Sequence, residues 1–233
     1  MGYNKGMQEH IFTLDEYYHI YNRGIEKRLI FLDDADRWRF LTTLFMFQWE
    51  NYLSRPGDLV SVIQHSMSDK TILEKSAYKK LFLSRVVELV CFCFMPNHFH
   101  LILKELKNSG ISLLMQRVGN SYTKYFNAKY ARKGHLFENR FQSIHIDKNE
   151  YLTHLSVYIH FTNPSELPEW RGKEIQYPWS SLQDFLLVNR WERFLSPAII
   201  LDQFEGKEEY KMFLDDGYTE NILENYRLIH NQH

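Results

Sequence analysis

Hydrophobic and polar residues recur along the first half of the chain with spacings that predict short strands and one amphipathic helix. The segment 16–22 (EYYHIYN) is short and aromatic and ends before Gly24, which is typical of a strand. Residues 33–48 begin with acidic residues and continue with apolar residues at helical spacing. This pattern predicts a helix that starts near Asp33 or Asp34.

Two apolar runs in the middle of the chain predict two more strands. Residues 86–95 (VVELVCFCFM) are apolar on both faces, as a central strand would be. Pro96-Asn97 interrupts this run, and residues 98–103 (HFHLIL) continue as a second strand. Before them, residues 51–80 carry Pro56-Gly57, and we expect a loop followed by a short helix over 68–82.

Further along the chain, the pattern predicts a helix, a strand, another helix and then short helices. The strand covers residues 141–146, and the following helix covers 149–161 with Asn149 or Asp147 as its cap. Pro164 prevents much continuation of that helix. The preceding helix, residues 111–130, has an apolar stripe formed by Leu114, Val118, Tyr122, Tyr125 and Phe126.

The order of these elements is βαββαβ, which predicts an α+β protein with a small antiparallel sheet and helices on one face. We expect one domain over residues 1–185, with an insertion near 51–80, and an acidic helical C-terminal extension over 186–233. The length of 233 residues, with 44% hydrophobic and 24% charged residues, is ample for such a core and argues against disorder.

The composition of the chain indicates its cellular compartment and the state of its cysteines. No apolar run approaches the roughly 20 residues needed to cross a bilayer, and the N-terminus lacks a signal-peptide pattern, so we expect a soluble cytoplasmic protein. The two cysteines, Cys91 and Cys93, lie two residues apart in a strand. They are poorly placed to bond each other or to form a zinc cluster, and we expect buried, reduced thiols.

Charge is balanced overall, at −1, but not along the sequence. Residues 104–140 contain eight basic and two acidic residues, a net charge of +6, whereas residues 202–224 carry a net charge of −6. The basic segment is suited to contact phosphates, although chance clustering of surface charge is a slightly better explanation of this pattern taken alone.

His98 and His100 form the first candidate site. Residues two apart in a strand point to the same face, so both imidazoles can reach one cation, while Phe99 and Leu101 point to the opposite, buried face. An isolated HxH pair is more often structural than metal-binding, so this motif alone is weak.

Tyr158 is the second candidate, because a nearby cation would favour its phenolate as a nucleophile. Helical spacing puts His154 and Thr162 on its face, where they would supply a base, a metal ligand or only packing. From spacing alone, Tyr158 cannot be distinguished from Tyr122, Tyr125 or Tyr151.

Several motifs together resemble a known family. The run FCFMPNHFHLILK is similar to the histidine–hydrophobic–histidine (HUH) motif of single-tyrosine insertion-sequence transposases, and SYTKYFNAKYARKGHLFENRFQS, EYLTHLSVYIHFTNP and YPWSS follow in the family's order. YHIYNRG also fits upstream. The REP-associated tyrosine transposases are the most similar branch. The likeness covers about residues 14–185, and neither residues 51–80 nor the acidic tail has a counterpart that we can place.

This resemblance implies a ferredoxin-like fold with both histidines on a central strand. It implies that His98 and His100 bind a divalent metal, Mg²⁺ or Mn²⁺, and that Tyr158 is the nucleophile. The family's third ligand is a polar residue one turn after the tyrosine; here Thr162 is at +4 and Asn163 at +5, and we prefer Asn163.

The implied activity is transposase-type cleavage and rejoining of single-stranded DNA through a 5′-phosphotyrosine intermediate, on DNA that folds into hairpins. The partner is therefore a single-stranded DNA hairpin rather than a membrane, and the protein is a monomer or a homodimer. The alternatives are a hairpin-binding protein that has lost catalysis and an unrelated metal-dependent phosphodiesterase that uses water. We expect the following residues to contact DNA: Arg23, Lys124, Lys129, Arg132, Lys133 and Arg140.

Overall fold

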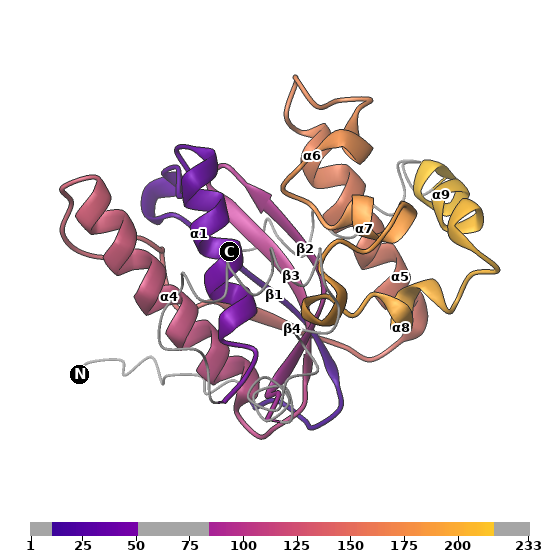
Figure 1. Cartoon of the computed structure of the whole chain (residues 1–233), viewed down its shortest axis with the longest axis horizontal. Coiled ribbons are helices and arrows are strands. Elements are labelled where there is room, and N and C mark those ends of the chain that lie inside the picture. The colour runs from indigo at the N-terminus through magenta and orange to yellow at the C-terminus, as the bar shows by residue number, and fades with distance from the viewer. Residues whose placement is uncertain (1–10, 51–83, 217–233) are drawn as a thin grey trace, which may run out of the picture.

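A four-stranded antiparallel sheet forms the centre of the molecule (Figure 1). The computed structural model describes residues 11–50 and 84–216, so the predicted loop and short helix within 51–83 lie outside the described residues. The strands run in the order β2-β3-β1-β4, which is the order of a ferredoxin-like sheet and confirms the predicted fold class. Their bounds are Tyr17–Arg23 (β1), Val87–Met95 (β2), His98–Glu105 (β3) and Gln142–Ile146 (β4).

The two helices of the βαββαβ unit cover one face of the sheet, as expected (Figure 1). They are α1 (Asp34–Met46) and α4 (Gly110–Lys129). Helix α1 begins at Asp34, within the predicted start, and Asp33 is its N-cap because its side chain accepts a hydrogen bond from the Asp36 amide. Aromatic side chains fill the layer between this face and the helices, where Phe40 contacts Phe94 and Phe99.

The chain after β4 covers the opposite face (Figure 1). Helix α5 (Asn149–Val157) continues directly into a π-helical turn, η3 (Tyr158–Thr162), and then into α6 (Asn163–Ser165). The cap predicted for α5 is wrong: Lys148 occupies the N-cap without a side-chain hydrogen bond. The remaining short elements are η1 (Ile25–Lys27), η4 (Glu174–Gln176), α7 (Leu182–Leu186), η5 (Glu192–Phe194), α8 (Ala198–Leu201) and α9 (Lys207–Asp216).

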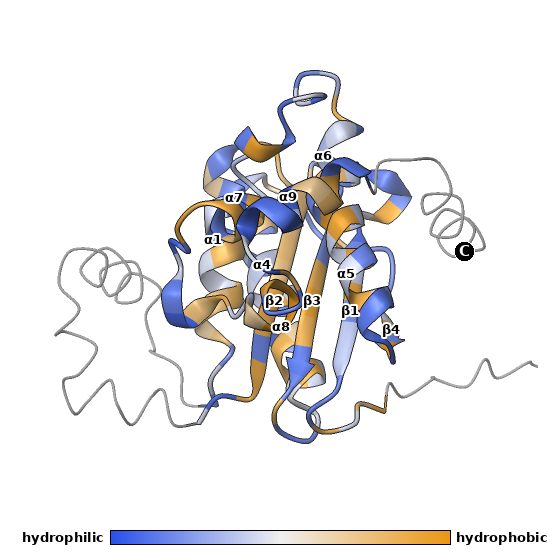
Figure 2. Ribbon diagram, turned by 90° about the vertical axis from the view of Figure 1, so that its right-hand side faces the viewer, coloured by the Kyte–Doolittle hydropathy of each residue, from blue (hydrophilic) through white to orange (hydrophobic). Residues whose placement is uncertain are grey.

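Strand β2 lies at an edge of the sheet, so the prediction of a central strand from its apolar pattern is wrong. The strand is buried along nearly its whole length, and most of its ribbon has the hydrophobic colour in Figure 2. The C-terminal chain covers its outer edge. The amide of Phe94 donates to the carbonyl of Trp179 at 2.9 Å, and the amide of Ser181 donates to the carbonyl of Phe92 at 3.0 Å. This pairing satisfies backbone groups that an open edge would expose.

Within residues 11–50 and 84–216, no helix combines the length and the apolar character that a transmembrane span requires.

Candidate active site

The strand register places the two histidines of the HxH motif on the face opposite α1 and α4. On β3, the rings of His98 and His100 lie 5.1 Å apart between centroids, and His100 is 4% exposed. Phe99 and Leu101 point to the other face and are buried there, as alternation along the strand requires. The expected side-by-side placement of the two imidazoles is therefore confirmed.

Tyr158 lies against this imidazole pair. Its ring meets the ring of His100 edge to face, with centroids 5.5 Å apart and an interplanar angle of 85°. The residue starts the π turn that follows α5, and its side chain is half-buried. Two segments that are 58 positions apart in the sequence thus bring a phenol and an imidazole into contact.

Neighbouring side chains orient both imidazoles. The Nδ1 atom of His98 lies 2.7 Å from Oδ1 of Asn97, and Nδ1 of His100 lies 2.9 Å from Nε2 of His19. A His98 that donates its Nδ1 hydrogen to this amide oxygen carries its lone pair on Nε2, the nitrogen suited to bind a cation.

Sequence reasoning missed His19 and Tyr21, which belong to the same cluster. Tyr21 pairs with His100 across β1 and β3, their ring centroids are 5.8 Å apart, and burial raises the pKa of Tyr21. The signal was present, because His19 and Tyr21 alternate on one face of a predicted strand. Only the pairing of β1 with β3 shows that this face is shared with His100.

The three competing tyrosines occupy different environments. Tyr122 is buried under α1, where its hydroxyl donates to the carbonyl of Ile30 and burial raises its pKa. The hydroxyl of Tyr125 donates to Asp36 near the same helix. Burial raises the pKa of Tyr151 to about 12, which disfavours its phenolate. Of the four, Tyr158 is the one whose ring contacts His100.

The π turn accounts for the extra residue in the helix that carries Tyr158. The backbone amide of Asn163 donates to the carbonyl of Tyr158, five residues earlier, so that Asn163 lies one wide turn beyond the tyrosine. The Nδ2 group of Asn163 also donates to this carbonyl, at 3.3 Å. Its Oδ1 is buried without a hydrogen-bond partner. A π turn of this kind often marks a functional site.

His154 lies next to the C-terminal helix α9. Its ring packs against Phe213 of α9, with centroids 5.1 Å apart, although Tyr158 follows it by one helical turn. This contact favours the packing role among the alternatives left open by the sequence.

The side chains around Tyr158 offer nitrogen and oxygen donors for a divalent cation. Within the described ranges, no group of three or more His, Cys, Asp or Glu side chains is arranged to hold a metal. An amide oxygen is a further possible ligand, and the partnerless, buried Oδ1 of Asn163 is such an atom. Two imidazoles and one amide oxygen are a nitrogen and oxygen donor set that suits a divalent ion with open positions.

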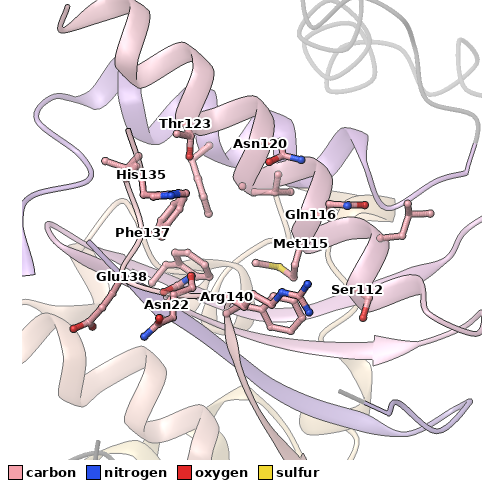
Figure 3. A pocket seen from close by; sticks show the side chains of 18 of the residues that line it. Asn22, Ser112, Met115, Gln116, Asn120, Thr123, His135, Phe137, Glu138 and Arg140 are labelled. Atoms are coloured by element: carbon pink, nitrogen blue, oxygen red, sulfur yellow. The ribbon is translucent and has the colours of Figure 1, made fainter. Parts of the chain in front are cut away.

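A large groove lies on the other face of the sheet, between α4 and the segment that leads into β4 (Figure 3). Its volume is about 1250 Å³. Lys124 and Arg140 line it together with Asn22 and Phe99, whose paired positions on β1 and β3 place the groove opposite the histidines. The polar and aromatic lining residues are suited to contact phosphates and bases.

The six residues expected to contact DNA differ in whether their charged groups are bound by other side chains of the protein. Lys129 does not face a groove: its ammonium group binds the carboxylates of Asp33 and Asp36, each at 2.7 Å. Arg132 donates to the side chain of Asn127. The remaining members are exposed or partly exposed: Lys124 and Arg140 in the groove, Lys133 after α4, and Arg23, which forms an ion pair with Glu138.

Acidic residues from elsewhere in the chain neutralise much of the positive charge of residues 104–140. Besides Lys129, Lys104 forms an ion pair with Asp15 at 3.1 Å, and Lys107 forms one with Glu50 at 2.7 Å. The linear charge pattern therefore overstates the positive potential that this segment presents to solvent.

Comparison with known proteins gives two similarities. Residues 61–162 match the sequence model of the family described as "Transposase IS200 like". This range contains the HxH motif and Tyr158, begins within the segment 51–80 that had no placed counterpart, and excludes YHIYNRG.

Among solved structures, that of "the REP associates tyrosine transposase bound to a REP hairpin" is similar at a TM-score of 0.46 and 12% identity. The alignment covers 82% of this chain and 91% of that chain. No curated protein matches the chain.

Proposed function

We propose, from the premise that this chain is related to the IS200-like transposases, that it cleaves and rejoins single-stranded DNA through Tyr158. The observation that carries the proposal is the edge-to-face contact between Tyr158 and His100. Of the four tyrosines compared, Tyr151, Tyr122, Tyr125 and Tyr158, it brings Tyr158 to the HxH motif. Within the family, we assign the chain to the REP-associated tyrosine transposases because of the motifs FCFMPNHFHLILK, EYLTHLSVYIHFTNP and YPWSS.

The reaction transfers a phosphodiester from DNA to the protein and back. The Tyr158 oxygen forms a bond to phosphorus while the bond from phosphorus to the 3′ oxygen breaks. The phenolic proton leaves to solvent, and the departing 3′ oxygen takes up a proton to become a hydroxyl. The 5′ phosphate stays on Tyr158, so the 3′ hydroxyl of a second strand can reverse the step and join new ends.

His98 and His100, with Asn163, are the residues that would hold a divalent metal, Mg²⁺ or Mn²⁺. When bound, such an ion polarises the scissile phosphate and favours the phenolate. Asn97 and His19 hold the two imidazoles in place through the contacts at 2.7 and 2.9 Å. Of the two possible third ligands, Asn163 is favoured over Thr162 because its amide oxygen is buried without a partner.

The groove next to α4, on the face of the sheet opposite the histidines, is the proposed binding surface for a DNA hairpin. Lys124 and Arg140 would contact its phosphates, and Phe137 and Phe141 are placed to contact bases. Because the groove and Tyr158 lie on opposite faces, the hairpin stem and the cleaved strand would occupy different sides of the sheet. The strand would then pass around an edge of the molecule to reach Tyr158.

A labelled-strand assay tests the proposal. The chain is incubated with Mg²⁺ or Mn²⁺ and a library of hairpin-bearing single strands with randomised loops and flanks, labelled at either end. A 3′ label should become covalently attached to the protein, whereas a 5′ label should appear on a shorter strand that ends in a 3′ hydroxyl.

Two tyrosine variants provide the matched comparison. Tyr158→Phe should abolish the adduct, whereas Tyr151→Phe, seven residues earlier, should retain it. Hairpin binding without any adduct, across the whole library and both metals, would favour the binding protein that has lost catalysis. Cleavage without an adduct, in wild type and Tyr158→Phe alike, would favour hydrolysis by water.

A further inference from the structure

A chain of buried hydrogen bonds lies behind the π turn, on the side away from His100. His160, in the middle of the turn, is fully buried, and both of its ring nitrogens have partners. Nδ1 lies 2.9 Å from the hydroxyl of Tyr210, and Nε2 lies 2.7 Å from the hydroxyl of Ser181. Residues two apart in a helix do not share a face, so His160 points to the C-terminal helices while Tyr158 meets His100.

Each hydroxyl group has one hydrogen to donate, and this determines which atom is the donor in each of these buried hydrogen bonds. Ser156 donates its only hydroxyl hydrogen to the carbonyl of Thr153 at 2.6 Å, so Tyr210 is the donor in its 3.0 Å contact with Ser156. Tyr210 therefore accepts from His160, whose Nδ1 carries the hydrogen. Nε2 of His160 is then the acceptor, and Ser181 donates to it at 2.7 Å in preference to the carbonyl of Phe92, which is 3.3 Å away.

The two ends of this series of hydrogen bonds, Ser181 and Ser156, are attached to elements that form the site. At one end, Ser181 accepts from the backbone amide of Phe92 on β2, at 2.9 Å, and the next residue, Cys93, pairs with His100. At the other end, Ser156 lies on α5, one residue before the end of the helix that leads to Tyr158. Tyr210 joins the two ends from α9, where it is fully buried.

We propose that His160 and Tyr210 are positioning residues, which hold the π turn in the one register that places Tyr158 against His100. The inference rests on the proposed function of Tyr158. A π turn is rare and persists only where its surroundings determine it. The hydrogen bonds of His160 to Tyr210 of α9 and to Ser181, which is itself bonded to β2, supply that constraint. Helix α9 thereby forms part of the catalytic unit, although its residues do not touch the reacting atoms.

The test compares two tyrosine-to-phenylalanine variants that each remove one buried hydroxyl. Tyr210→Phe breaks the chain at His160, whereas Tyr122→Phe removes the bond to Ile30 on the other face of the sheet. Tyr210→Phe should slow single-turnover adduct formation at least about tenfold, since small displacements of a reacting group are costly, while hairpin affinity stays unchanged. Tyr122→Phe should lower Tm without changing the adduct rate.

A spectroscopic measurement decides the inference even for a protein that forms no adduct. With ¹³C-labelled tyrosine rings, the NMR signal of Tyr158, assigned through Tyr158→Phe, should shift or broaden in Tyr210→Phe and stay in place in Tyr122→Phe. Absence of adduct in the wild type would defeat the proposed function alone. An unmoved Tyr158 signal in Tyr210→Phe, or an equal shift in both variants, would overturn the positioning role. If Tyr210→Phe does not fold, Ser156→Ala, which removes the acceptor of the same chain, replaces it.

Discussion

His160 is enclosed so completely that burial lowers the pKa of its imidazole to about 3. An unfolded chain binds a proton at this residue below a pH of about 6.5, whereas the folded protein does so only near pH 3. The free energy of unfolding should therefore fall as pH falls through this window, by roughly 2 kcal/mol at pH 5 from this group alone.

Urea unfolding at pH 7 and pH 5 measures this contribution. His160→Gln should lose less stability between the two pH values than the wild type does. His135→Gln, which changes an exposed histidine after α4, should keep the wild-type difference. An unchanged difference in His160→Gln would show that this imidazole is not held neutral by burial.

Asn163 and Thr162 compete for the role of third ligand, and the π turn favours Asn163. Asn163→Ala should weaken Mn²⁺ binding at least about tenfold, an effect as large as the loss of a supporting group in other metal sites. Thr162→Val, which keeps the shape of the side chain, should have little effect. Electron paramagnetic resonance of free Mn²⁺ measures both affinities without DNA, and the reverse order would assign the ligand to Thr162.

Lys124 and Lys129 lie on one helix but have different partners. Lys124 lines the groove, whereas the ammonium group of Lys129 binds Asp33 and Asp36. If Lys124 contacts a phosphate, Lys124→Ala should reduce the slope of log K against log salt for hairpin binding by about 0.9. Lys129→Ala should lower Tm and leave the slope unchanged; fluorescence anisotropy at several salt concentrations distinguishes these outcomes.

Among the elements, those with a strong hydrophobic pattern were predictable from the sequence. The four strands, α1 and α4 follow from the spacing of their apolar residues, because each buries hydrophobic side chains on one face or on both. The pattern of β2 was misinterpreted, since covering by residues 179–181 produces the same apolar pattern as a central position. Backbone pairing between segments 85 positions apart leaves no local signal in either segment.

The candidate site was predictable only in part, for a similar reason. His98 and His100 follow from alternation in a strand, but their contact with Tyr158 depends on how the chain after β4 folds back on the sheet. The π turn was visible only as an apparent extra residue before Pro164. The resemblance to transposases supplied the choice of Tyr158, which spacing could not.

In the part of the molecule that the structure describes, residues 186–216 are hydrogen-bonded to the sheet and to the chain just after α1. The amide of Ser196 donates to the carbonyl of Leu89 on β2 at 2.8 Å, and the side chain of Gln48 donates to the carbonyl of Phe194. The division at residues 185 and 186 remains a prediction, and these contacts give it a direct test.

A chain truncated after residue 185 would lose these contacts and expose part of the edge of β2. We expect a lower Tm and self-association, because an open strand edge pairs with other chains. Size-exclusion chromatography with light scattering and a thermal melt measure both. A truncated chain that stays as stable and as small as its mass predicts would support two independent units.

The two faces of the sheet give the molecule two distinct surfaces, one with Tyr158 and the histidines and one with the groove. In the proposed reaction, Tyr158 is the point at which DNA becomes covalently attached. Digestion of the trapped protein–DNA adduct, followed by tandem mass spectrometry, measures this directly. We predict that the nucleotide mass is carried by Tyr158 through a 5′ phosphate; attachment to any other residue, or to a 3′ phosphate, would contradict the account.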